Sequence, residues 1–337
     1  MKKRIWSWRV TAGFGALFAV ALVVGVSLGP IPLPFAGVVQ TLFGGGHALR
    51  SVDQAVLLQI RLPRVILAGL VGAALATSGA VYQTVFRNPL ADPYLLGVAA
   101  GAGLGATLAF VLGGSVLLGA TGVALVPVFA FVGALAAVAV TFLVAGARRS
   151  DPRTLLLAGV AVGSFATAAQ TYLFQSHTQI LRTVYSWILG QLVAADWVTV
   201  AWTAGYLALA LGVLFVIARR LDGLLLSDEE AHSLGLKPAR LRAVAIAAAT
   251  LATATAVAAG GLIGFVGLVI PHLIRGLLHK ATNRSLPAIA LAGGAFLIFA
   301  DLGARTLLSP AELPIGVITA FVGAPFFLWI LRRGGRP

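Results

Sequence analysis

The chain has 337 residues, of which 59% are apolar and 10% are charged. A soluble domain carries about 45–50% apolar and about 25% charged residues, so this chain has too little polar surface to coat a water-soluble globule. The net charge of +14 would favour nucleic acid as the partner of a soluble chain, but the basic residues flank apolar runs, which indicates orientation in membrane lipid and no nucleic-acid partner. Cysteine is absent, which excludes disulfide scaffolds, thiolate metal sites and cysteine nucleophiles.

Ten apolar windows are each long enough to cross a bilayer core of about 30 Å as a helix. Helices are expected because a backbone in lipid must satisfy its own hydrogen bonds. The sequence therefore predicts an all-α polytopic membrane protein. The windows are 10–29, 65–86, 94–113, 122–147, 154–176, 197–218, 241–259, 262–278, 286–304 and 314–331.

The basic residues predict how these windows are oriented. If the N-terminus is cytoplasmic, 19 of the 24 lysines and arginines fall on the cytoplasmic side. Cytoplasmic loops carry the excess of basic residues in membrane proteins, so we expect both termini in the cytoplasm and ten transmembrane helices. The basic residues on the outer side are Arg50, Arg61, Arg64, Arg182 and Arg305.

Two connecting segments are longer than a simple turn. The outer segment, 30–63, begins with three prolines and contains a stretch, 35–43, that predicts a short interfacial helix. The inner segment, 219–242, is the most polar part of the chain. In it, Ser227 before three acidic residues predicts a helix N-cap, and Gly235 fits the helix C-terminus. Such a solvent-facing helix is either a docking surface or an ordinary solvated loop.

The sequence holds no GxxxxGK phosphate loop, HExxH zinc motif or GxSxG nucleophile motif. The run GAGLGA at 101–106 matches a dinucleotide fingerprint, but that fingerprint should follow a strand. Here the run follows the start of an apolar helix, so the match is dismissed. Gly97, Gly101 and Gly105 repeat every four residues, which predicts close approach of another helix. A second close crossing is expected at Gly260, Gly261, Gly264 and Gly267.

The titratable residues give no metal site. The histidines are scattered, and for His272 capping or packing is expected before metal binding. Asp301 and Arg305 stand at i and i+4, which predicts an ion pair, although Arg305 also faces outside, where an acidic partner would compete for it. The other histidines are His47, His177, His232 and His279.

The fifth window carries a polar stripe along one face of the helix. A stripe facing lipid would be costly, so it either bonds to neighbouring helices or lines a hydrated path. No acidic or lysine side chain lies at mid-depth to relay protons or sodium, which argues against an ion-coupled carrier and leaves the energy source to a partner. The stripe is Ser164, Thr167, Gln170, Thr171 and Gln175.

Five motifs in order give the chain a family resemblance. They are RLPR at 61–64, GAVYQ at 79–83, RNPLADPYLLG at 87–97, GFVGLVIPH at 264–272 and ELPIGV at 312–317. Together with the ten windows, they resemble the FecCD-type permeases, which are membrane subunits of ABC importers for ferric siderophores, haem and cobalamin. The resemblance covers nearly the whole chain.

The resemblance implies a homodimeric type II ABC importer permease, with the chain, 1–337, as one transmembrane domain. The cargo path would run along the dimer interface in the cytoplasmic membrane of a prokaryote. Two ATPase subunits would bind ATP and Mg²⁺, so this chain would be no enzyme and would hold no cofactor. A periplasmic or lipid-anchored binding protein would deliver the cargo.

The resemblance also carries residue roles. It implies path lining by the polar stripe, docking of the binding protein by Arg61, Arg64 and Arg305, and a cytoplasmic gate at Asn88, Pro89, Leu90, Arg149, Ser150 and Asp151. Within the loop at about 219–242, it implies coupling to the ATPase by Leu226, Ser227, Asp228, Glu229, Glu230, Ala231, His232, Leu234 and Gly235.

Some positions depart from the family pattern. Tyr94, Ala99-Ala100, Ser227 and Leu262 stand where Gly, Ser-Ser, Gly and Pro are common, which limits any transfer of fine gate geometry. A ferric siderophore is the expected cargo because it is the commonest in the family; haem is second and cobalamin third. The rivals from other classes are an ion-coupled carrier and an intramembrane enzyme, and the latter would need carboxylates or histidines together at membrane depth.

Overall fold

The computed structural model describes residues 2–44, 49–113, 117–118, 123–148, 151–193, 195–278 and 282–334. The regular secondary structure of these residues is helical apart from one antiparallel pair of two-residue strands, so the all-α architecture is confirmed with that small addition. The elements are α1 (Lys2–Ser27), α2 (Phe35–Phe43), α3 (Ser51–Ala55), the π-helical η1 (Val56–Arg61), α4 (Leu62–Val85), α5 (Val98–Val111), β1 (Leu117–Leu118), β2 (Val123–Ala124), α6 (Leu125–Ala145), η3 (Gly146–Arg148), α7 (Pro152–Ser176), η4 (Thr178–Ile180), α8 (Leu181–Ile188), α9 (Trp197–Leu221), η5 (Asp222–Leu225), α10 (Asp228–Ser233), α11 (Pro238–Gly260), α12 (Val266–Leu278), α13 (Thr282–Thr306) and α14 (Ile315–Gly334).

Each apolar window of the sequence coincides with one helix. Among the described residues, seven helices are long and apolar enough to cross a membrane, and α5, α12 and α14 are shorter apolar helices. The short helix predicted at 35–43 is confirmed as α2, with the bounds expected from the sequence, and its interfacial position stays a prediction. The third window, 94–113, starts earlier than its helix, because residues 92–97 form a turn before α5.

Helices α4 and α11 form the interior of the bundle, while α1 and α9 lie at its edge. The most apolar stretch of α4 is 83% buried and that of α11 is 72% buried, against 22% for α1 and 28% for α9. Lipid gives no hydrophobic drive between helices, so close packing of small residues must hold the interior together. Helix α11 accordingly consists largely of alanine and threonine.

Glycine allows the closest helix crossings. A Cβ atom at Gly79 of α4 would lie 1.8 Å from the carbonyl oxygen of Gly267 on α12. A Cβ atom at Gly101 or Gly105 of α5 would lie 2.4 or 2.1 Å from a backbone oxygen of α6. The predicted packing role is thus confirmed for Gly101, Gly105 and Gly267, whereas Gly264 has open space around it.

Hydroxyl groups supplement this packing between the two interior helices. The Tyr82 hydroxyl of α4 lies 2.8 Å from the Thr250 hydroxyl of α11. The Ser78 hydroxyl donates to the carbonyl oxygen of Ala249 at 3.0 Å. Such interhelical bonds satisfy polar groups that lipid cannot, and they fix α4 against α11.

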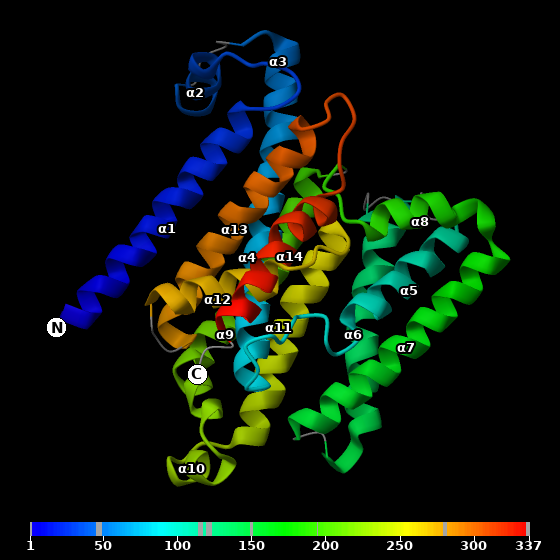
Figure 1. Ribbon diagram of the computed structural model, residues 1–337. Helices are drawn as coiled ribbons and strands as arrows, with labels where there is room; N and C mark the ends of the chain where they lie inside the picture. Colours follow the sequence, from blue (N-terminus) through cyan, green and yellow to red (C-terminus); the bar gives the residue numbers. More distant parts are fainter. Residues whose placement is uncertain are drawn as a thin grey trace.

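The two ends of the bundle differ. Figure 1 shows α10 at one end and α2 and α3 at the other, with both chain ends in the half that carries α10. Helices α5, α6, α7 and α8 form one side of the bundle, and α1, α12 and α13 lie on the other side of α4 and α11. The polar inner segment and the proline-rich outer segment therefore lie at opposite ends, as the sequence predicted.

Candidate functional site

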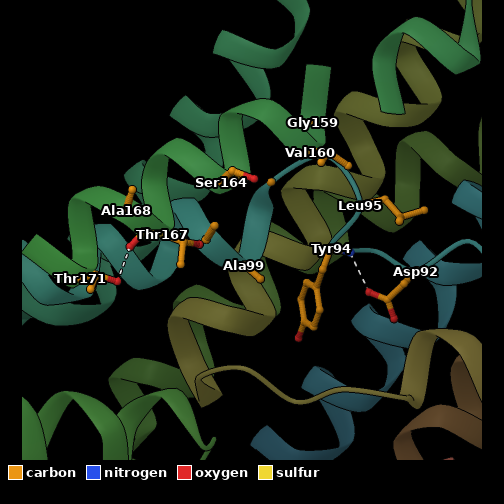
Figure 2. Close-up of a pocket in the computed structure, with 13 residues that line it drawn as sticks. Asp92, Tyr94, Leu95, Ala99, Gly159, Val160, Ser164, Thr167, Ala168 and Thr171 are labelled. Carbon is orange, nitrogen blue, oxygen red and sulfur yellow. Dashed lines mark hydrogen bonds between the residues drawn. The ribbon is translucent and has the colours of Figure 1, made fainter. Parts of the chain in front are cut away.

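A broad concave surface lies between α5, α7 and the turn that precedes α5. Its volume is about 700 Å³, and small and hydroxyl side chains dominate its wall (Figure 2). No lysine or arginine lines it. The lining residues are Asp92, Tyr94, Leu95, Gly97, Ala99, Ala100, Gly159, Val160, Gly163, Ser164, Thr167, Ala168 and Thr171.

The polar stripe of α7 divides into two parts. Ser164, Thr167, Thr171 and Gln175 are exposed, and the first three line the concave surface. Gln170 is buried, and its amide nitrogen donates to the Thr107 hydroxyl on α5 at 2.9 Å.

Helix geometry explains this division. At about 100° per residue, the four exposed stripe positions span about 80° of the helix circumference, and Gln170 lies outside that arc. One stripe residue thus bonds to a neighbouring helix and three line the concave surface, while lining of a hydrated path stays a prediction. The assignment of Gln170 to this surface is corrected for that reason.

The start of α7 depends on Asp151, one of the predicted gate residues. Its carboxylate caps the helix by accepting from the backbone N–H groups of Arg153 and Thr154, both at 3.2 Å. The hydroxyl of Thr154 also donates to it at 2.7 Å, and these hydrogen bonds hold the pKa of Asp151 below its usual value. Asp151 is exposed, and its side chain caps the N-terminus of α7. Arg149 and Ser150 lie outside the described residues.

The turn before α5 adds two lining residues that the sequence analysis did not assign, Asp92 and Tyr94. The Asp92 carboxylate accepts from the backbone N–H of Tyr94 at 2.8 Å, and burial raises the pKa of Asp92. An Asx turn of this kind is a local signal that the motif contained. The Tyr94 hydroxyl donates to the carbonyl of Ile263 at 3.0 Å and accepts from its N–H at 3.2 Å. It thereby ties this turn to the break between α11 and α12.

The other predicted gate residues lie on the exposed part of the same loop. Asn88, Pro89 and Leu90 are all exposed, and the Asn88 side chain accepts from the N–H of Leu90 at 2.9 Å. The loop follows Arg87, whose backbone has a positive φ of 50°. The structure therefore brings Asn88–Leu90 and Asp92 into one loop.

Helix α10 has the caps that the sequence predicted. The Ser227 hydroxyl accepts from the N–H of Glu230 at 3.2 Å, and the Glu230 carboxylate accepts from the N–H of Ser227 at 2.9 Å. Gly235 ends the helix with a φ of 75°. Of the predicted coupling residues, Ala231 is buried and the others are exposed.

Asp228 attaches α10 to two other elements. Its carboxylate accepts from Arg87, at the end of α4, at 3.2 Å, and also from Arg242 of α11. Arg87 additionally donates to the carbonyl oxygens of Leu224, at 2.7 Å, and Leu226. Hydrogen bonds from Arg242 chiefly hold the pKa of Asp228 below its usual value. No local sequence pattern signals this contact, since Arg87 and Asp228 are far apart along the chain.

At the opposite end, the arginines expected to dock a partner are buried. Arg61 and Arg305 are each 3% exposed and Arg64 is 6% exposed. The Arg61 guanidinium donates to the backbone oxygens of Val26, at 3.2 Å, and Ser27, at 2.9 Å. It therefore caps the C-terminal end of α1, where the helix dipole favours a cation.

Arg64 and Arg305 share Asp301 in a buried network. Arg64 Nε lies 2.9 Å from Asp301, and its other nitrogens bond to Glu312 at 3.0 and 2.9 Å. Arg305 Nε lies 2.9 Å from Asp301, which confirms the predicted i, i+4 pair, and it also donates to the carbonyl of Gly25. All three arginines are thus engaged by groups of the chain itself. Docking through them stays a prediction.

No metal centre is found in the described ranges, where no group of three or more histidine, cysteine or acidic side chains could hold an ion. His272 is half-buried in α12, and His47 and His279 lie outside the described residues. The described residues thus offer a weakly polar concave surface and, at α10, the ion pairs of Asp228 with Arg87 and Arg242, with no grouped metal ligands.

Comparison with known proteins agrees with this geometry. Residues 17–333 match the model of the FecCD transport family. The chain is 38% identical to the cobalamin import system permease protein of Halobacterium salinarum, over 96% of this chain and 88% of that protein. It is 40% identical to the hemin transport system permease protein of Yersinia pestis, over 96% of each. A solved structure of an inward-facing metal-chelate type ABC transporter matches with a TM-score of 0.84 and 30% identity, covering 96% of this chain and 99% of that one.

Proposed function

This chain belongs to the FecCD transport family, and we propose that, as the permease of a metal-chelate type ABC importer, it moves a ferric siderophore across the cytoplasmic membrane. The observation that carries the proposal is the concave surface of α5 and α7. Hydroxyl groups and small side chains line it, with no lysine or arginine, so a bulky polar chelate would pass without being held. Its relatives include permeases named for cobalamin and for hemin, which keeps haem and cobalamin as alternative cargoes.

The proposed topology is ten spans with both termini in the cytoplasm, within one transmembrane domain. The excess of basic residues on the side of α10 supports it. The position of both chain ends in the α10 half of the bundle also supports it (Figure 1). Two copies would then face each other across the exposed stripe of α7, so that the concave surface becomes half of a corridor.

The partners in this proposal are two ATPase subunits on α10 and a binding protein on the outer face. Helix α10 offers an exposed, capped helix with the free carboxylate of Glu229 at its start, which suits docking better than an unstructured loop would. ATP and Mg²⁺ would bind to the ATPase. On the outer face, Arg61, Arg64 and Arg305 would act mainly by holding α1, α4 and α13 in the shape that the binding protein meets.

We propose that the gate responds to α10 through Arg87. The Arg87 guanidinium bonds to Asp228 of α10, and the residue directly precedes the gate loop Asn88–Leu90. The same loop continues to Tyr94, which is bonded to Ile263 at the break between α11 and α12. A movement of α10 would thus reach the concave surface through the Asp228–Arg87 contact and the backbone of the loop that continues to Tyr94. Asp151, at the start of α7, would form the other part of the gate, with Arg149 and Ser150.

Reconstitution tests the proposed function. Proteoliposomes that contain this chain, its ATPase subunits and its binding protein should accumulate an ⁵⁵Fe-labelled siderophore only when ATP and Mg²⁺ are present inside. Haem and cyanocobalamin, offered with the same binding protein, test the alternative cargoes. Uptake by the chain alone under a proton or sodium gradient would contradict the importer and favour an ion-coupled carrier.

The coupling role of α10 is tested by substituting each of its two neighbouring glutamates in a separate variant. Glu229→Lys reverses an exposed charge and leaves the capping box intact, whereas Glu230→Lys also breaks the cap that Ser227 and Glu230 form. Both variants should lower uptake per ATP hydrolysed, and Glu230→Lys should lower it further because the helix frays. If the Glu229→Lys variant kept wild-type uptake, the charge of Glu229 would not contribute to the contact with the ATPase.

A further inference from the structure

A second cavity lies at the cytoplasmic end of α9 and α11, away from the concave surface. It has a volume of about 620 Å³ and is formed where α9 ends, where α11 begins and where the chain leaves α10. Three cationic side chains line it, and no acidic side chain does. The cations are Arg220, Lys237 and Arg240.

These three cations are exposed and have no anionic partner in the part of the chain that the structure describes. The acids of the same segment, Asp222, Asp228, Glu229 and Glu230, do not line the cavity. Asp228 accepts from Arg87 and Arg242, and Glu230 accepts from Ser227. Three like charges gathered around one cavity repel each other, and an anion bound between them would relieve that repulsion. The cavity therefore suits an anionic ligand.

The floor of the same cavity is apolar and belongs to the membrane-spanning helices. Ile217 precedes the last turn of α9, and Val244 lies almost two turns into α11. Next to it, Val216 of α9 is 82% exposed, as expected for a side chain that faces lipid. A ligand in this cavity would thus be charged on the cytoplasmic side and apolar on the membrane side.

A separate, mainly apolar groove lies further along α11. It has a volume of about 350 Å³ and lies between α11 and the cytoplasmic half of α6. The α11 wall is made by Ala243 and Ala247, which lie one and two turns beyond Arg240 on the exposed face of that helix. The α6 wall includes Leu135 and Phe142. Small residues on one side and large apolar residues on the other leave room for an extended hydrocarbon chain.

We propose that an anionic phospholipid of the cytoplasmic leaflet binds here, with its phosphate between Arg220, Lys237 and Arg240 and an acyl chain along α11. The assignment rests on the proposed topology, which puts α10 on the cytoplasmic side. Basic pockets between transmembrane helices on that side recognise acidic headgroups, and each cation near the surface contributes about 1 kcal/mol. The bound lipid would brace the end of α9 against the start of α11, the two stems from which the coupling segment projects.

The test measures lipid binding to the full chain by native mass spectrometry in detergent. Dioleoylphosphatidylglycerol is titrated against dioleoylphosphatidylcholine for the wild type and for the pocket variant R220Q/K237Q/R240Q. The matched control is R9Q/R219Q/R332Q, which removes the same charge from exposed arginines outside the cavity. The pocket variant should lose on the order of 10- to 100-fold in affinity for phosphatidylglycerol, and the control should stay within about twofold of the wild type.

Three results would overturn the proposal. Equal losses in both triple variants would mean diffuse surface charge. Displacement of phosphatidylglycerol by inorganic phosphate or glycerol 3-phosphate at equal concentration would mean a site for a free anion. Loss of the lipid when the chain is purified with its ATPase subunits would mean that the ATPase covers the cavity.

A single variant covers the case in which the triple variant does not fold. Lys237→Gln should lower the affinity for phosphatidylglycerol by about fivefold, and unchanged affinity in this variant would also overturn the site. The experiment is independent of the cargo, because it measures no uptake. If the siderophore uptake assay failed, the result of the lipid-binding experiment could still be interpreted.

Discussion

Among single residues, Asp228 connects the exposed helix α10 to the two interior helices of the bundle. Its carboxylate joins α10 to the end of α4 through Arg87 and to the start of α11 through Arg242. Both guanidinium groups come from helices whose positions are set by the interior of the bundle. A side chain that is itself half exposed thus fixes the orientation of the exposed helix.

We predict that Asp228→Asn loosens α10 and lowers the uptake obtained per ATP severalfold, while ATP hydrolysis continues. Loss of the charge weakens the hydrogen bonds to Arg87 and Arg242. Hydrogen exchange of the α10 amides measures the loosening directly. Glu229→Gln, which removes the adjacent exposed charge, should leave that exchange unchanged, and equal exchange in all three proteins would contradict the anchor.

The pH dependence of this anchor follows from the direction of the pKa shift. Because hydrogen bonds from Arg242 lower the pKa of Asp228 in the folded chain, its stabilising contribution is complete above the ordinary pKa of an aspartate, about 3.9. The contribution is lost only as the pH falls through the lower folded value. Exchange of α10, corrected for its intrinsic rate, should therefore be constant between about pH 6 and 8 and rise only in acid.

Arg64 gives the corresponding prediction at the outer end. Arg64→Gln leaves Asp301, a 1% exposed carboxylate, with only Arg305 as an ionic partner. Breaking a buried pair costs about 3–5 kcal/mol, so the thermal midpoint of the purified chain should fall by several degrees. Added salt should not change this loss, because buried pairs are little screened.

A control separates this role from docking. Arg50→Gln removes a cation whose side chain is 86% exposed, so the thermal midpoint should stay at the wild-type value. If Arg64→Gln kept the wild-type midpoint and instead weakened binding-protein affinity in a salt-dependent way, direct docking by Arg64 would be supported over the structural role.

At the scale of the elements, the crossing of α4 and α12 depends on the absence of a single methyl group. Gly79→Ala would put a Cβ atom 1.8 Å from the carbonyl oxygen of Gly267, which forces the helices apart. Overpacking of this kind costs about 1–3 kcal/mol, and we expect a lower thermal midpoint and a lower yield of folded chain.

The matched control lies on the partner helix. Gly276 of α12 has no atom within 4 Å of where its Cβ would be, so Gly276→Ala should be neutral or slightly stabilising, because alanine favours the helix by about 0.5–1 kcal/mol. Equal midpoints for Gly79→Ala and the wild type would show that the two helices can separate without cost.

At the scale of the whole molecule, the concave surface is open on the side of α7. Large apolar side chains flank the hydroxyl stripe there: Phe165 is 76% and Tyr172 is 72% exposed. The Thr171 hydroxyl donates within its own helix to Thr167. A polar face of this kind is still costly against lipid alone, because lipid offers no further hydrogen-bond partner. A second copy across a two-fold axis would give it both an apolar contact and a hydrated gap.

The absence of cysteine from the chain makes this prediction direct to test. Thr171→Cys, on the exposed stripe, should give a covalent dimer with a bis-maleimide in native membranes. Val216→Cys, on the lipid-facing side of α9 and 82% exposed, should remain monomeric under the same treatment. Equal cross-linking at both positions would mean random collision and would argue against a dimer across α7.

The sequence alone determined the helical membrane class, the positions of the apolar windows, the caps of α10 and the short helix α2. These features depend on local hydrophobicity, on helix geometry and on residues within one turn of each other. The close crossings could be anticipated for the same reason, since a four-residue glycine repeat lies on one helix face. The family motifs added the expected roles of the loops.

Only the tertiary structure decided which polar groups meet. Arg87 and Asp228, Tyr94 and Ile263, and Arg64 and Glu312 are each separated by well over a hundred residues. No local pattern encodes such pairs, because they form only when α4 is enclosed by the C-terminal half of the chain. The same packing buried the outer arginines and turned Gln170 towards α5, since burial depends on neighbours that the periodicity of one helix does not specify.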